Sequence, residues 1–90
     1  MTLLEVRNEI LGIDTEIIKL IKKRLACADK VAAAKREEGG SPVDAVQREK
    51  VLKRSYEMAK MAGIDPEMTK EIFEILIRMN EKRQTELKKR

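Results

Sequence analysis

The sequence predicts an all-α fold of three helices, in one domain spanning residues 1–90. Aromatic residues make up only 2% of the chain, fewer than a β-sandwich or barrel normally uses. Charged residues make up 40%, which is typical of helices that keep one face in water. Glycine and proline cluster at only two places, so three long stretches of helical periodicity remain between them.

The residues around these two interruptions are those of helix ends. Asp44 is a predicted N-cap, and Gln47 three residues later would complete a capping box. Gly63 suits the left-handed position that follows a helix. Asp65 and Pro66 form an N-cap followed by a proline in the first turn. We therefore expect helices over three segments, residues 3–38, 44–62 and 66–88.

The first predicted helix is too long for a compact monomer of this size. Its apolar residues recur at three- and four-residue spacing: Ile10, Ile13, Ile17, Leu20, Ile21, Ala28 and Val31. A helix of this length forms a rod of about 50 Å, whereas a compact globule of the whole chain is only about 30 Å across. The apolar stripe therefore predicts an intertwined homodimer with the long helices side by side. An ordinary antiparallel coiled coil fits the periodicity equally well.

Two cations lie in line with this stripe. Arg24 and Lys35 are eleven residues apart, which leaves them about 20° out of register and about 16 Å apart along the axis. Ala28 and Val31 lie between them as a small apolar floor, so the pair is suited to clamp a small dianion. The alternative, in which both side chains snorkel to solvent, agrees with the spacing as well.

The other polar candidates can also be interpreted either as ligand contacts or as ordinary surface or core residues. Arg7 lies about 25 Å from Arg24 along the same helix, so only a partner chain's Arg7 could share a site with Arg24. Arg48 and Glu49 occupy the first turn of the second helix, where an acid is ordinary helix chemistry. Gln84 shares a helix side with three other residues, which predicts a core hydrogen bond or a ligand contact. Those three are Phe73, Ile77 and Asn80.

Composition excludes several functional classes. The net charge of +4 is spread along the chain, so we expect no nucleic-acid-binding stripe. No apolar run reaches membrane-spanning length, and charges interrupt the N-terminus, so we expect a cytoplasmic protein without a membrane segment or signal peptide. The lone Cys27 allows no internal disulfide and is expected to be a small core residue. The chain has no histidine and no metal-ligand cluster, which is consistent with our expectation that it uses neither a metal nor a cofactor.

An ordered set of motifs resembles the small all-helical chorismate mutases. The resemblance runs from about Val6 to Gln84, nearly the whole chain. It rests on Val6-Arg7-x-x-Ile10, Ile13-Asp14, Leu20-Ile21-x-x-Arg24, Val31-Ala32-x-x-Lys35, Pro42-Val43, Arg48-Glu49, Gly63-Ile64-Asp65 and Phe73-x-x-x-Ile77-x-x-Asn80-x-x-x-Gln84.

This resemblance implies an enzyme, an isomerase that converts chorismate to prephenate in phenylalanine and tyrosine biosynthesis. It implies an entwined homodimer in which residues of one chain meet the partner's Arg7 around each substrate. By analogy, Arg7 and Arg24 bind the two carboxylates of chorismate, and Lys35 and Gln84 donate hydrogen bonds to its ether oxygen. The remaining implied contacts are Glu49 to the ring hydroxyl, Arg48 as organiser of the pocket, and Asn80 at a small polar position.

The sequence departs from the family at one position and leaves two other functions open. Many members carry an acid near the ring hydroxyl where this chain has Ala45, and the adjacent Asp44 is expected to cap a helix. Isochorismate-pyruvate lyase activity fits the same fold and cationic pocket. A non-enzymatic helical dimer or nucleic-acid-binding module is the third hypothesis, and it predicts that Arg24 and Lys35 face solvent.

Overall fold

A computed structural model, which describes residues 1–89, confirms the three-helix, all-α architecture. The helices are α1 (Leu3–Glu38), α2 (Ala45–Ala62) and α3 (Pro66–Lys88), and no strand occurs among the described residues. These bounds agree with the predicted segments to within one residue. The single shift is at the start of α2, because Asp44 lies outside the helix as its N-cap.

The helix ends form as the sequence predicts, with one exception. The Asp44 carboxylate accepts a hydrogen bond from the Gln47 amide at 3.0 Å, and Asp65 caps α3 by accepting from the Met68 amide at 2.9 Å. The predicted capping box is only half formed. Within residues 1–89 the Gln47 side chain returns no hydrogen bond to Asp44, and Gln47 is an exposed residue in the lining of a cavity instead.

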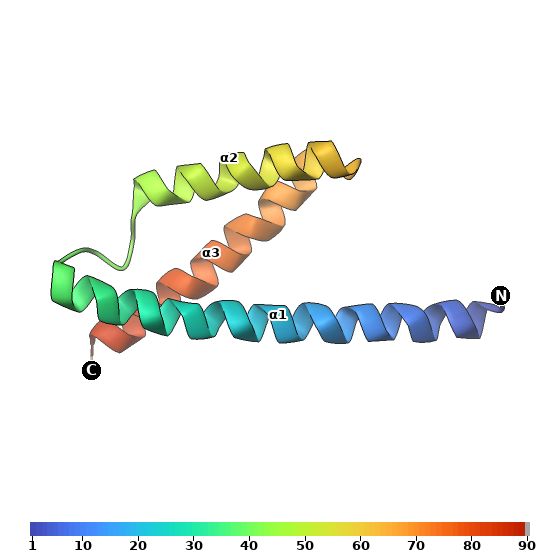
Figure 1. Cartoon of the computed structure of the whole chain (residues 1–90), viewed down its shortest axis with the longest axis horizontal. Helices are drawn as coiled ribbons and strands as arrows, with labels where there is room; N and C mark the ends of the chain where they lie inside the picture. The colour runs from blue at the N-terminus through green and yellow to red at the C-terminus, as the bar shows by residue number, and fades with distance from the viewer. Residues whose placement is uncertain (90) are drawn as a thin grey trace.

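Gly63 ends α2 in the left-handed conformation, with φ 75° and ψ 24°. Its amide donates to the carbonyl of Lys60, and the Ile64 amide donates to that of Ala59. These two bonds satisfy carbonyls that the end of a helix leaves unpaired. The resulting sharp turn sends α3 back along α2 as a hairpin (Figure 1).

The third helix lies against both of the others. α3 packs on α2 at one end and crosses the C-terminal half of α1 at the other, while α1 and α2 are held apart (Figure 1). Val51, Leu52 and Ile77 form the buried cluster between α2 and α3, and Phe73 packs against it. The packing of α3 therefore decides which residues of α1 and α2 meet.

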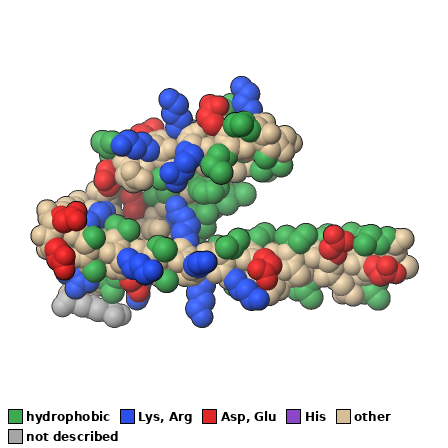
Figure 2. Space-filling model, viewed as in Figure 1, with side chains coloured by type: hydrophobic (Ala, Val, Ile, Leu, Met, Phe, Trp, Pro, Cys, Tyr) green, Lys and Arg blue, Asp and Glu red, His purple; other side chains and the backbone are tan. Residues whose placement is uncertain are grey.

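The N-terminal half of α1 projects from this core as a long arm. The chain measures 54 × 27 × 14 Å with a radius of gyration of 16.2 Å, against about 12 Å for a compact chain of this length. Ile10, Ile13 and Ile17 are each about half exposed there, and Figure 2 shows hydrophobic side chains along the edge of the arm that faces α2. No helix in the described range is long and apolar enough to cross a membrane.

We predict opposite effects of alanine at two glycines. Gly63→Ala should lower the free energy of unfolding by about 1 kcal/mol, because an L-residue is strained at a φ of +75°. Gly12→Ala should raise it by about 0.5–1 kcal/mol, since Gly12 is inside a helix with open space around it. Urea unfolding at one protein concentration measures both. Equal effects at the two sites would contradict the assignment of Gly63 as the helix terminator.

Candidate active site

An open cavity lies where the three helices approach one another. Its volume is about 520 Å³, and it is lined by the C-terminal half of α1, the N-terminal half of α2, the C-terminal half of α3 and the loop between α1 and α2. Among the predicted site residues, the cavity brings together Arg24, Lys35, Arg48, Asn80 and Gln84. These residues span the chain from position 24 to position 84, so the tertiary fold is what makes them one site.

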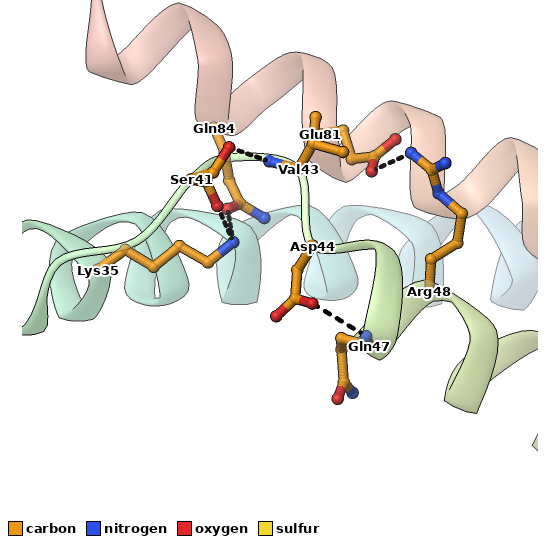
Figure 3. Close-up of polar contacts among 8 residues, drawn as sticks. All are labelled: Lys35, Ser41, Val43, Asp44, Gln47, Arg48, Glu81 and Gln84. Atoms are coloured by element: carbon orange, nitrogen blue, oxygen red, sulfur yellow. Dashed lines mark hydrogen bonds and ion pairs between the residues drawn. The ribbon is translucent and has the colours of Figure 1, made fainter.

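Lys35 and Gln84 form a hydrogen-bonded pair in the wall of this cavity. The Lys35 Nζ donates to Gln84 Oε1 at 3.0 Å and to the Ser41 carbonyl at 2.6 Å (Figure 3). Gln84 is buried, and because its Oε1 accepts from lysine, its Nε2 remains as a donor. Lysine has three N–H donors and uses two of them here. Lys35 therefore has one N–H left for a ligand, and Gln84 has its amide nitrogen.

Arg24 is held against α3 by a backbone contact. Its Nη1 donates to the Leu76 carbonyl at 3.2 Å, and its side chain is partly buried. Burial lowers the pKa of Arg24, the positive charge of Arg54 lowers it further, and Cys27 acts in the opposite direction. An arginine nevertheless stays charged at neutral pH. The snorkelling alternative is wrong for Arg24 and for Lys35, because both side chains donate hydrogen bonds to residues of α3.

The apolar floor between these two cations differs from the prediction. Val31 lines the cavity as expected, but Ala28 is only 1% exposed and lies under α3 instead. Cys27 lines the cavity in its place and is exposed, so its assignment to the core is wrong for the single chain. At 100° per residue, Cys27 and Ala28 lie on opposite sides of Arg24, and α3 covers the Ala28 side.

Arg48 is paired across the cavity with an acid that the sequence did not single out. Its Nη2 contacts Glu81 Oε2 at 2.5 Å, linking α2 to α3 (Figure 3). Glu81 precedes Gln84 by three residues, so these two share one face of α3. This spacing is the sequence feature that could have identified Glu81 as a site residue. A single acid at such a position is, however, usually a solvent-exposed surface residue.

The charges that line the cavity leave it positive. Four cations and two carboxylates from the described residues do so, a net of two positive charges: Arg24, Lys35, Arg48, Arg54, Asp44 and Glu81. Asp44 is already engaged as the cap of α2. Among residues 1–89 no group of three or more histidine, cysteine or acidic side chains is placed to hold a metal. The net positive charge of the lining suits a small organic dianion.

Two predicted site residues lie outside this cavity. Glu49 is exposed and does not line it, because it follows Arg48 by one residue and points about 100° away around α2. Arg7 is exposed on the projecting arm of α1, about 25 Å from Arg24. Ala45 borders the neighbouring loop and not the cavity.

A second ion pair fixes α3 against α1. The Arg83 guanidinium donates to both carboxylate oxygens of Asp29, at 2.7 and 3.1 Å. The hydrogen bonds and charge of Asp29 raise the pKa of Arg83. Because Arg83 adjoins Gln84, this bidentate contact helps set the position at which Gln84 meets Lys35.

The fold and this set of residues agree with the comparisons with known proteins. The family model described as chorismate mutase type II matches residues 6–85. The chain belongs to that family. It is also 37% identical, over 79 residues, to a chorismate mutase from Methanocaldococcus jannaschii, and the match covers 87% of this chain and 79% of that relative. The family indicated by the sequence motifs is thereby confirmed.

Proposed function

We propose that this chain converts chorismate to prephenate, within the biosynthesis of phenylalanine and tyrosine, by electrostatic and conformational catalysis. The observation that carries this proposal is the hydrogen-bonded pair of Lys35 and Gln84 in the wall of a cavity whose lining has a net charge of two positive. Chorismate carries two carboxylates, so its charge matches that of the cavity. The expected cytoplasmic location rests on composition and stays a prediction.

The reaction requires positioning more than reactive groups. One carbon–oxygen bond breaks while one carbon–carbon bond forms in the same molecule, so no atom enters or leaves. The enzyme must hold a flexible dianion in its compact conformer, which converts binding into a large entropic advantage. The Arg24 guanidinium suits a carboxylate geometrically, and its contact with the Leu76 carbonyl restricts its orientation.

Lys35 and Gln84 would stabilise the transition state. Negative charge develops on the ether oxygen as the carbon–oxygen bond lengthens, and fixed donors aimed at that atom act most strongly at that moment. The Lys35 ammonium is held by Gln84 and Ser41, which leaves its third N–H for the oxygen. The Gln84 Nε2 supplies a second, uncharged donor. Neither group needs to reorganise during the reaction.

We further propose that the working unit is an intertwined homodimer. The arm of α1 exposes apolar residues such as Leu11 and Leu20, which are each more than 60% exposed in the single chain. Covering each such side chain contributes about 1.5–3 kcal/mol. An antiparallel partner arm would bring the partner's Arg7 to the open side of the cavity, where it would bind the second carboxylate.

Arg48, Asn80 and Glu49 have supporting roles in this proposal. Arg48 organises the pocket from α2, and Asn80 contributes a small polar contact from α3. The hydroxyl contact assigned to Glu49 by resemblance stays a prediction, because the Glu49 side chain lies outside the single-chain cavity.

Lys35→Ala should lower kcat/KM for chorismate by at least about 100-fold, because it removes a fixed donor to the ether oxygen. Continuous absorbance at the chorismate band measures the turnover. Lys30→Ala is the matched control, since Lys30 is an exposed lysine of the same helix outside the cavity. Circular dichroism should show both variants folded. Near-normal turnover by folded Lys35→Ala protein would refute the proposed role.

Subunit mixing tests whether the sites are shared. Arg7→Ala and Arg24→Ala should each lose at least about 100-fold in kcat/KM. When the two are unfolded together and refolded as a mixture, each heterodimer regains one site with both arginines. Random pairing then restores about a quarter of the wild-type activity. Mass spectrometry can verify the heterodimers, and their failure to regain activity would exclude shared sites.

A substitution in the loop tests the placement of Lys35. Gly40 has a φ of +136°, and a Cβ there would meet the Lys35 Cγ at 3.3 Å. Gly40→Ala should therefore displace the ammonium and lower kcat by about tenfold or more. Gly39→Ala is the control, since its φ is also positive but its Cβ would meet nothing within 4 Å. Equal losses of activity in the two variants would indicate loop strain alone.

A further inference from the structure

Glu81 is an unexpected carboxylate in a cavity that is otherwise suited to anions. Its side chain is only 15% exposed, and it lines the cavity between Asn80 and Gln84 on α3. Its Oε2 pairs with Arg48 (Figure 3), and among residues 1–89 no hydrogen bond is found to its other oxygen, Oε1. A negative charge here weakens dianion binding unless it serves a contact of its own.

The substrate of the proposed function has one group that calls for such an acceptor. Apart from its two carboxylates and its ether oxygen, chorismate carries a ring hydroxyl, which is a hydrogen-bond donor. A hydroxyl removed from water without an acceptor is costly, and a carboxylate is a stronger acceptor than a neutral oxygen. A site that recognises the hydroxyl therefore needs an anionic oxygen within its walls.

The other acids near the cavity are poorly placed for this role. Asp44 is exposed and uses its carboxylate to cap α2. Glu49 does not line the cavity, and the acid that the family often carries is replaced by Ala45. Glu81 is thus the partly buried carboxylate of the described residues that lines this cavity with an oxygen left over from its ion pair.

We propose that Glu81 accepts a hydrogen bond from the ring hydroxyl of chorismate through Oε1, while Arg48 holds the carboxylate in place through Oε2. This inference rests on the proposed function and names a substrate-binding residue for it. The ion pair with Arg48 fixes the direction of the free oxygen of Glu81. The negative charge of Glu81 repels the two carboxylates of the substrate, so Glu81 also favours the orientation in which the hydroxyl lies against α3.

The test compares chorismate with an analogue that lacks the ring hydroxyl. The wild-type protein should prefer chorismate in kcat/KM, and Glu81→Gln should lower kcat/KM for chorismate by about 10- to 100-fold. The value for the deoxy analogue should change less than about threefold, because it never makes the contact. Glu81→Ala, which removes the acceptor entirely, should abolish the preference. Glu74→Gln, at an exposed position of α3 outside the cavity, is the control.

The outcomes separate this inference from the function on which it rests. If the wild-type protein does not turn over chorismate, the proposed function itself fails. If it does, an equal loss on both substrates in Glu81→Gln means that Glu81 only positions Arg48, and the inference is overturned. Unchanged turnover of both substrates overturns it too. Loss of the preference in Glu49→Gln but not in Glu81→Gln would assign the hydroxyl to Glu49 instead.

Discussion

The close packing of α3 on the C-terminal half of α1 determines the geometry of the whole site. Ala28 and Ala32 are the buried residues of α1 at this contact, and their small side chains let the two helices approach closely. The bidentate contact between Arg83 and Asp29 restricts sliding and rotation of α3. As a consequence Gln84 reaches Lys35, although 49 residues separate them in the chain.

The cavity contains charges of both signs, and they have different effects on the binding of an anion. Its cations provide attraction for a dianion, yet Arg48 is already partly neutralised by Glu81. Such a pair costs affinity for an anion, but it also fixes the direction of both side chains before a ligand arrives. Preorganisation of this kind matters more for catalysis than total positive charge, since only contacts that strengthen in the transition state raise the rate.

The length of α1 links stability to function. A single chain leaves the arm uncovered, and its radius of gyration of 16.2 Å exceeds that of a compact chain. The same arm carries Arg7 far from the chain's own cavity. In the proposed dimer, the contact that covers the apolar stripe would also bring the partner's Arg7 to the cavity. Folding and catalysis would then depend on the same association.

The sequence by itself determined the three helices, their caps at Asp44 and Asp65, and the turn at Gly63, because these features depend on neighbours within a few residues. Together with the family motifs it also identified five cavity residues. Only the tertiary structure decided that α3 covers Ala28 and leaves Cys27 in the cavity, and that Glu81 pairs with Arg48. Helical periodicity gives the angle between side chains, but the packing of another helix selects which sector is buried.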